Sequence, residues 1–403
     1  MSRRADLDGV RGFACLSVLT LHIVIGPITF QPGTIYDAVR LALQPFMVGG
    51  VDLFFVLSGF LISGILMDEK AKGKTARQYF FRFWRHRFAR IFPVYYLMIG
   101  LLLAIYTING LYSSAYTRAL LFDQMPIWTY ATFTQNFYMI FNGVYGNFLG
   151  VTWSLAMEEQ FYLLLPLAVF FLSRGDIAKV AVAMILLAPV VRAILWELHS
   201  WQASYHLSPA RMDTIMWGVL IAYIIRRPDF VEALSTRIRW IDGFIVVSIA
   251  LIAGNVFYYA SAPVISQPST HALGLFISTL RYSLLATVYA LVILRLYLPG
   301  ANWVKAFFSN RWLGRVGLVS YGAYMYHQFF NLTVHFWLNG RASAVISDWR
   351  QWYLPSLVFA LTFGAAALSY RYMEAPIMAW ARNEKKPIAP NDPAVARSHS
   401  ATT

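Results

Sequence analysis

Long apolar runs separated by short polar segments occupy most of the chain between residues 10 and 372. A run of about 20 predominantly apolar residues is long enough to cross the hydrocarbon core of a bilayer as a helix, and a helix satisfies its own backbone hydrogen bonds there. The pattern predicts ten spans, near residues 10–29, 50–67, 91–108, 153–172, 177–196, 209–225, 241–260, 272–294, 316–338 and 352–372. We therefore expect an all-α fold, a polytopic transmembrane helix bundle.

The composition favours a membrane protein over a soluble domain. Hydrophobic residues make up 58% of the 403 residues and charged residues 13%, whereas about 25% of residues are charged in a typical soluble domain. A chain of this length cannot bury so much apolar surface in one core, so we expect lipid to cover part of it. The single cysteine, Cys15, excludes an intrachain disulfide and is expected to be a small buried side chain.

The basic residues are distributed unevenly between the two sides of the predicted spans. A net charge of +14 could indicate nucleic-acid binding. With the N-terminus in the cytoplasm, however, 24 of the 33 lysines and arginines fall in cytoplasmic segments and four in external ones. Lysine and arginine concentrate in the cytoplasmic loops of membrane proteins, so the charge follows topology. We expect both termini in the cytoplasm and no nucleic-acid partner.

Three segments outside the spans shape the expected organisation. One integral domain is expected from residue 7 to residue 380, followed by a polar tail at 383–403 that is expected to be disordered. The stretch 109–150 is aromatic and interrupted by glycine, so it predicts an external loop with partial helices at the interface. Residues 68–90 form the most basic segment, which we interpret as a cytoplasmic loop that leads straight into a span.

Two ionisable residues of the first span, Arg11 and His22, lie on the same side of a helix. They are eleven residues apart, close to three helical turns, which places them ~16 Å apart along the axis. Ionisable groups inside a membrane are costly and mark function by default. Such a face suits an elongated ligand with an anionic head and a reactive end, and coenzyme A has that shape. A buried structural histidine is the alternative for His22.

The basic segment ends with Arg87 and Arg90, which share one helix face at a spacing of three. Paired guanidinium groups present the planar, forked donors that phosphate groups favour. The alternative is an anchor that contacts lipid headgroups on the cytoplasmic side.

Further polar residues occur inside the predicted spans. Glu158 and Glu159 are adjacent, so at most one of them points into a given pocket. A carboxylate beside a histidine can fix the histidine tautomer or raise its basicity. Tyr321, Tyr324 and His327 form one helical stripe, which fits either a polar cavity wall or a packed aromatic seam. No glycine-rich nucleotide loop, metal-ligand spacing or nucleophile elbow is present, and no metal is expected.

Seven stretches, in order along the chain, resemble the acyltransferase-3 family of integral membrane acyltransferases over about residues 7–380. They are residues 7–11 followed by His22, then 50–60, 87–96, 153–162, 211–213, 320–327 and 370–376. Each stretch alone is modest evidence, but their common order on matching spans is specific. Some family members carry an additional soluble domain after the membrane part.

The resemblance implies an enzyme that moves an acyl group, above all acetyl, from acyl-CoA to a sugar hydroxyl of a surface or secreted glycan. The expected location is the cytoplasmic membrane of a bacterium, and acetyl-CoA is expected as a substrate. The expected catalytic residues are His22, as general base or transient acyl carrier, and Glu158. The expected coenzyme A ligands are Arg11, Arg87 and Arg90. Residues expected in or near the pocket are Asp52, Tyr324, His327, Arg211 and Asp213.

A transporter or flippase of a glycan or lipid-linked substrate is the alternative, because it would also bury charged residues. Such proteins more typically show paired repeats with broken helices, and the sequence shows none. A non-catalytic receptor would leave the alignment of Arg11 with His22 unexplained. The acyltransferase hypothesis adds a geometric expectation. His22 should line a cavity that opens toward the cytoplasm, with Asp52, Glu158 and His327 in or near its wall, because buried charges must meet one another or water.

Overall fold

The computed structural model describes residues 4–27, 40, 43–44, 46–146, 148–261, 274–275, 277–300, 303–341 and 344–382. All regular elements in these residues are helices, which confirms the all-α prediction. The tail at 383–403 lies outside the described residues, as do residues 28–29 and 272–273 of the predicted first and eighth spans.

The predicted spans correspond to long helices. These are α1 (Ala5–Thr20) with the π-helical turn η1 (Leu21–Ile25), α3 (Gly50–Ala71), α4 (Ala76–Leu111), α8 (Trp153–Phe171), α9 (Arg174–Leu198), α11 (Met212–Ile224), α13 (Ile238–Ser261), η4 (Ile277–Arg281) with α15 (Tyr282–Arg295), α17 (Arg311–Asn339), and α18 (Tyr353–Ser369) with η6 (Tyr370–Glu374) and α19 (Ala375–Arg382).

Short helices connect the long ones. They are α5 (Ala115–Leu121), α6 (Ile127–Ala131), α7 (Gln135–Asn142), η2 (Gly150–Thr152), α10 (Trp201–His206), η3 (Ser208–Arg211), α12 (Pro228–Ser235), α16 (Trp303–Phe308) and η5 (Trp349–Trp352). The first three confirm the prediction of partial helices within residues 109–150.

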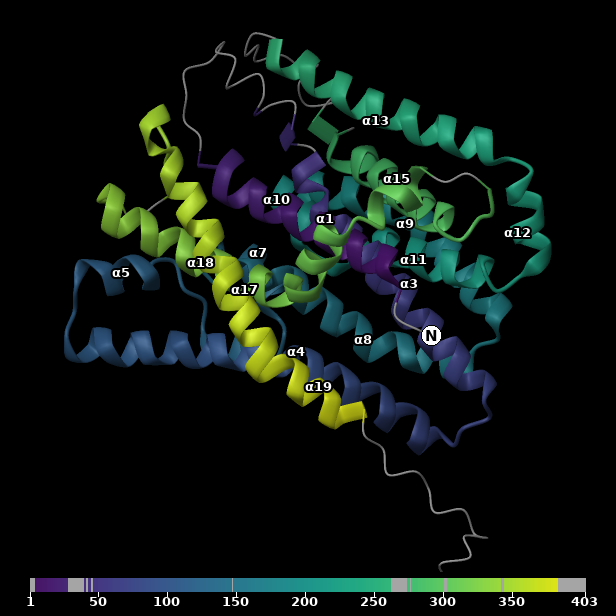
Figure 1. The fold of residues 1–403 in the computed structure, drawn as a ribbon, viewed down its shortest axis with the longest axis horizontal. Helices are drawn as coiled ribbons and strands as arrows, with labels where there is room; N and C mark the ends of the chain where they lie inside the picture. The colour runs from purple at the N-terminus through teal and green to yellow at the C-terminus, as the bar shows by residue number, and fades with distance from the viewer. Residues whose placement is uncertain are drawn as a thin grey trace, which may run out of the picture.

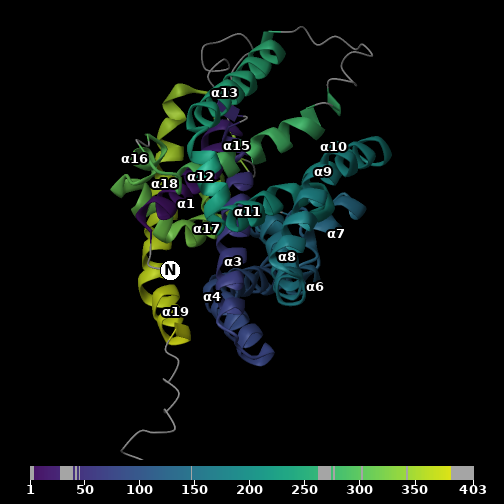
Figure 2. The ribbon, with the colours of Figure 1, turned by 90° about the vertical axis from the view of Figure 1, so that its right-hand side faces the viewer.

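The helices α1, α3 and α17 occupy the middle of the bundle. Figure 1 shows α13 and α12 along one edge, with α4 and α19 along the opposite edge. Figure 2, turned by 90°, shows the same separation of α13 from α4 and α19. The helix α1 packs against both α17 and α3, and α3 also packs against α8 and α11. Side chains from α1, α3, α4, α8 and α17 can therefore meet inside the bundle.

Six helical segments in the described part of the chain are long and apolar enough to cross a bilayer. They are Ala5–Ile25, Phe46–Ala71, Ala76–Leu111, Gly150–Phe171, Arg174–Leu198 and Arg350–Arg382. Large apolar side chains also remain exposed on outward faces, such as Leu186 on α9 and Val246 on α13. The chain is thus a polytopic membrane protein, whereas the count of ten spans and the cytoplasmic termini stay predictions.

The basic segment 68–90 is helical almost throughout, contrary to the predicted loop. The helix α3 continues to Ala71 and α4 already begins at Ala76, so only residues 72–75 connect them. Thr75 caps α4 reciprocally with Gln78, whose backbone N–H donates to the Thr75 hydroxyl over 3.4 Å. Arginine also favours helix. At 36 residues, α4 is ~54 Å long, which exceeds the ~30 Å hydrocarbon core.

A pair of glycines allows α1 and α17 to approach backbone to backbone. A Cβ atom placed on Gly12 would lie 2.0 Å from the Leu313 carbonyl oxygen and 3.1 Å from the Gly317 nitrogen. A Cβ on Gly317 would lie 1.9 Å from the Asp8 carbonyl oxygen. Small residues at helix crossings are the usual means of close packing in membranes. The contact sets the position of Arg11 and His22 relative to the side chains of α17.

Replacing Gly12 by alanine is expected to destabilise the protein by roughly 1–3 kcal/mol, because the added methyl group meets backbone that cannot move aside. Thermal unfolding of the detergent-solubilised protein measures the effect. The matched control is Gly314→Ala on α17, where a Cβ would meet nothing within 4 Å, and a helical glycine replaced by alanine normally gains stability. Equal stability of the two variants would contradict the close α1–α17 contact.

Candidate active site

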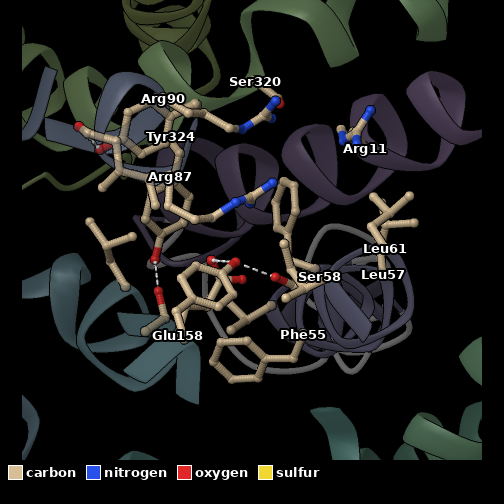
Figure 3. Close-up of a pocket in the computed structure, with 18 of the residues that line it drawn as sticks. Arg11, Phe55, Leu57, Ser58, Leu61, Arg87, Arg90, Glu158, Ser320 and Tyr324 are labelled. Atoms are coloured by element: carbon tan, nitrogen blue, oxygen red, sulfur yellow. Dashed lines mark hydrogen bonds between the residues drawn. The ribbon is translucent and has the colours of Figure 1, made fainter. Parts of the chain in front are cut away.

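A cavity of about 180 Å³ lies among α1, α3, α4, α8 and α17. Its wall on α3 extends from Val51 to Ile65, which is ~21 Å along the helix axis, so the cavity is long and narrow. Its polar wall residues, most of them drawn in Figure 3, are Arg11, Ser58, Arg87, Arg90, Ser154, Glu158, Tyr162, Ser320, Tyr321 and Tyr324. Five residues expected at the site from the sequence, Arg11, Arg87, Arg90, Glu158 and Tyr324, therefore share one cavity.

Three guanidinium groups give the cavity an excess of positive charge. Figure 3 shows their nitrogen atoms directed toward one region of the cavity, from α1 for Arg11 and from α4 for Arg87 and Arg90. Arg11 is paired with Asp8 over 2.6 Å. Within the described part of the chain, neither Arg87 nor Arg90 is in an ion pair, so both remain available to an anionic ligand.

Glu158 is bonded within the wall of the cavity. The Tyr162 hydroxyl, one turn further along α8, donates to the Glu158 Oε2 atom over 3.0 Å and is also hydrogen-bonded to the Ser58 hydroxyl. The Arg87 guanidinium lies over the Tyr162 ring, 5.5 Å from its centroid. Glu158 lines the cavity and Glu159 does not, as expected from the choice between the two. Tyr162 and Ser58 are not among the predicted site residues, although the spacing of four between Glu158 and Tyr162 places these two on one helix face.

His22 forms a hydrogen-bonded pair with His327. The Nδ1 atom of His22 lies 2.9 Å from the Nε2 atom of His327, and the two rings are stacked with centroids 5.1 Å apart. His22 sits in the π-helical turn η1, a type of irregularity that is frequent at functional sites. The Asn331 side chain donates to the His22 carbonyl oxygen over 3.1 Å and so ties this turn to α17.

The geometry determines which nitrogen of each ring carries a hydrogen. The Nδ1 atom of His327 lies 2.5 Å from the Tyr324 carbonyl oxygen, and a carbonyl oxygen only accepts hydrogen bonds. The hydrogen of neutral His327 is therefore on Nδ1, which leaves Nε2 as an acceptor. His22 must then donate from its Nδ1 atom, so its Nε2 atom keeps a free lone pair. That nitrogen can accept a proton or attack a carbonyl carbon.

Tyr324 lies between the cavity and the histidine pair. It lines the cavity, whereas neither His22 nor His327 does, contrary to the expectation for His22. The Tyr324 ring is 5.6 Å from the His327 ring, and its hydroxyl donates to the Val151 carbonyl oxygen over 2.7 Å. The Ser154 hydroxyl is 2.6 Å from the same phenol oxygen. These bonds hold the ring at the end of the cavity that is nearest to His327.

Asp52 and Arg211, both expected near the pocket, instead pair with each other in the interior. The side chains are at most 1% exposed, and the Arg211 Nη2 atom donates to the Asp52 Oδ1 atom. The guanidinium also lies 4.4 Å from the centroid of the Tyr282 ring. Neither residue lines the cavity. Asp52 therefore does not form part of the cavity wall, because a buried carboxylate pairs with a nearer cation from another helix. A place behind the wall, next to the lining residue Val51, stays a prediction.

Asp213 belongs to a second buried ion pair, with Arg192 of α9. The Arg192 Nη1 and Nη2 atoms donate to the two carboxylate oxygens over 3.0 and 2.7 Å. The Ser283 hydroxyl donates to Asp213 over 2.8 Å, and the Arg192 Nε atom donates to the Thr279 carbonyl oxygen over 3.0 Å. The two ion pairs together join α3, α9, α11 and α15 and support the helices around the site rather than the cavity itself.

Metal coordination has no evident site in the part of the chain that the structure describes. No group of three or more His, Cys, Asp and Glu side chains there is placed to hold an ion.

The chain is similar to a family model and to several known proteins. A family model described as an acyltransferase domain matches residues 4–371. The peptidoglycan O-acetyltransferase OatA of Listeria monocytogenes is 27% identical over 391 residues, which cover 92% of this chain and 55% of that protein. The O-acetyltransferase OatA of Staphylococcus aureus is 25% identical over 393 residues, covering 92% of this chain and 56% of that protein.

A putative peptidoglycan O-acetyltransferase of Bacillus subtilis, YrhL, is 31% identical over 210 residues, covering 47% of this chain and 28% of that protein. The chain thus spans about half the length of the relatives that it matches over most of its own length. No solved structure matches it.

Proposed function

The chain belongs to the acyltransferase-3 family of membrane proteins, and from this premise we propose that it moves an acetyl group from acetyl-CoA to a sugar hydroxyl of a peptidoglycan-type glycan. The similarity to peptidoglycan O-acetyltransferases supports the acceptor class. The observation that supports the proposal is the cavity with three guanidinium groups, one end of which is formed by Tyr324. Tyr324 contacts His327, and His327 in turn holds His22, whose Nε2 atom has a free lone pair.

The proposed location is the cytoplasmic membrane of a bacterium, with ten spans and both termini in the cytoplasm. The unequal distribution of lysine and arginine supports this orientation. Arg11 near the start of α1 and Arg87 in the first half of α4 then lie toward the cytoplasm, where acetyl-CoA is available. His22, eleven residues further along the first span, lies deeper in the membrane and closer to the side on which such glycans are found.

The three arginines are proposed to bind the phosphate groups of coenzyme A. Guanidinium groups bind phosphate through two parallel hydrogen bonds, and Arg87 and Arg90 are free of ion pairs within the described residues. The cavity of about 180 Å³ is smaller than the ~300–1,000 Å³ of sites that enclose a whole ligand. It suits the thin arm that ends in the thioester, with the nucleotide held at the mouth.

His22 is proposed to catalyse the transfer through its Nε2 atom in one of two ways. As general base, Nε2 takes the proton of the acceptor hydroxyl while the oxygen attacks the thioester carbon; the C–S bond breaks and the thiol leaves. As acyl carrier, Nε2 itself attacks, an N–C bond replaces the C–S bond, and the acceptor oxygen then breaks the N–C bond. His327 holds the required tautomer in both cases. The sequence predicts a carboxylate in that role, whereas Glu158 forms part of the cavity wall.

The deciding experiment is turnover of acetyl-CoA by the purified full chain reconstituted in bilayers, with peptidoglycan fragments as acceptor. We expect one free thiol released per acetyl ester formed on the glycan. Thiol release without acetylated glycan would contradict the acceptor class. Absence of both products, from protein shown to be folded by its thermal transition, would contradict the acyltransferase function itself.

Replacing Arg87 or Arg90 by lysine is expected to raise the apparent KM for acetyl-CoA about tenfold, with kcat little changed, because lysine keeps the charge but loses the forked pair of donors. Steady-state kinetics in acetyl-CoA measures the change. Arg77→Lys is the matched control, since Arg77 is exposed at the start of α4 and does not line the cavity. An unchanged KM in both site variants would favour a role in contacting lipid headgroups.

Replacing His327 by leucine is expected to lower kcat about 10–100-fold without raising the KM for acetyl-CoA, by analogy with the range found when a partner that orients a metal-bound histidine is lost. His327→Gln should recover much of the activity, because its amide oxygen can accept the hydrogen of His22 Nδ1. A purely structural role for His327 predicts instead that the two variants lose activity in proportion to their loss of thermal stability.

A further inference from the structure

A second concave surface lies on the opposite side of α4 from the cavity. It is a groove of about 450 Å³ between α4 and α19, within the ~300–1,000 Å³ range of ligand sites. Its lining is aromatic and apolar except for one arginine, and it comprises Phe81, Trp84, Arg85, Phe88, Ala89, Phe92, Pro93, Ile377 and Trp380. None of these side chains lines the cavity that contains Arg87 and Arg90.

The sequence of α4 separates its arginines between two faces. Phe81, Arg85, Phe88 and Phe92 recur at spacings of four, three and four, which places them along one side of the helix. Arg87, two residues after Arg85, is rotated by about 200° and so faces the cavity instead. The basic character of this helix thus serves the cavity on one face and the groove on the other.

The groove combines exposed aromatic rings with positive charge. Phe81 is 64% exposed, Phe88 44% and Trp380 72%. The Arg85 guanidinium lies over the Phe81 ring, 5.8 Å from its centroid. Residues 72–92 contain seven lysines and arginines and no aspartate or glutamate. An aromatic groove in a helix that enters the bilayer, with basic residues above it, matches the chemistry of one acyl chain beneath one anionic headgroup.

We propose that this groove binds one anionic phospholipid, with an acyl chain along Phe88, Phe92 and Trp380 and the headgroup phosphate at Arg85. The charge complementarity selects this occupant. A zwitterionic lipid offers the same acyl chain but an opposing positive group, and a second copy of this chain on the same face would bring another Arg85 guanidinium close to the first. The site is independent of acetyl transfer, because it shares no residue with the cavity.

Two tryptophans in the groove, Trp84 and Trp380, allow a direct test, since brominated acyl chains quench tryptophan fluorescence on contact. The full chain is reconstituted in phosphatidylcholine vesicles with an equal minor fraction of either brominated phosphatidylglycerol or brominated phosphatidylcholine. We expect the anionic lipid to quench more, with about fivefold higher relative affinity, as one guanidinium–headgroup contact provides. Excess soluble glycerol phosphate should not relieve the quenching, because it lacks the acyl chain.

Matched variants locate the site. Arg85→Gln is expected to remove the preference for the anionic lipid, whereas Arg77→Gln, which removes the same charge from an exposed position outside the groove, should retain it. The variant with both Trp84→Phe and Trp380→Phe should lose the lipid-selective part of the quenching.

Equal quenching by both lipids in the wild type, or equal losses in the two arginine variants, would overturn the proposal in favour of diffuse surface attraction. Absence of quenching in a protein that light scattering shows to be dimeric would overturn it in favour of a second copy.

Discussion

Replacing His22 by alanine is expected to lower the rate of acetyl transfer by about 10²–10⁴-fold, the contribution typical of a positioned general base. The reason is that Nε2 of His22 is the nitrogen left with a free lone pair by the hydrogen bonds through His327 to the Tyr324 carbonyl oxygen. Initial rates of thiol release and of glycan acetylation measure the loss. The KM for acetyl-CoA should change little, because the three arginines of the cavity remain.

The matched control is His199→Ala, an exposed histidine at the end of α9 that lies outside the cavity and the histidine pair. It should transfer acetyl at the wild-type rate. Near wild-type transfer by folded His22→Ala protein would contradict both proposed mechanisms. Incubation with labelled acetyl-CoA in the absence of glycan separates the two, since only the carrier mechanism leaves label on wild-type protein that His22→Ala lacks.

Replacing Asp213 by alanine is expected to destabilise the protein by roughly 3–5 kcal/mol, because it leaves the fully buried Arg192 guanidinium without its counter-ion. The affected contacts join α9, α11 and α15, so the helices that support the site should separate at a lower temperature. Thermal unfolding of the purified protein in detergent, followed by circular dichroism, measures the change.

Two further variants test the physical reason for that loss. Asp229→Ala breaks an ion pair of similar length, but both partners are about half exposed, so little change is expected. The double variant with Arg192→Met and Asp213→Leu removes both charges at once and should be more stable than Asp213→Ala alone. A double variant less stable than the single one would contradict an uncompensated buried charge as the cause of the loss.

Local spacing in the sequence was sufficient to predict properties that depend on a single helix. The length of the apolar runs indicated a polytopic membrane protein, and six helices of suitable length and composition among the described residues confirm it. A spacing of three placed Arg87 and Arg90 on one face of α4, and both line the cavity. The choice of Glu158 over Glu159 also follows from helix geometry together with the family pattern, and Glu158 is the one in the cavity wall.

The extent of α4 shows where local patterns misled. The high density of arginine and lysine between Asp68 and Arg90 predicts a loop exposed to water. Helix propensity and the Thr75 capping box act regardless of solvent, so the helix begins at Ala76 and carries its arginines into the bundle. The same helix is also long and apolar enough to cross a bilayer.

Only the tertiary structure decided which side chains of different helices contact each other. His22 pairs with a histidine 305 residues away, and Asp52 pairs with an arginine 159 residues away. Neither His22 nor Asp52 lines the cavity. Such pairings depend on which helices are neighbours and at what rotation, and close contacts such as Gly12 against Leu313 and Gly317 set these. The position of a residue in the sequence determines on which face of its own helix the side chain lies. The side chain that it meets belongs to a distant segment, and the placement of that segment depends on packing along the whole helix interface. The sequence therefore determined the membrane class, the family and five of the ten polar residues in the cavity wall, while the tautomer of His22 and the partners of the buried charges required the assembled bundle.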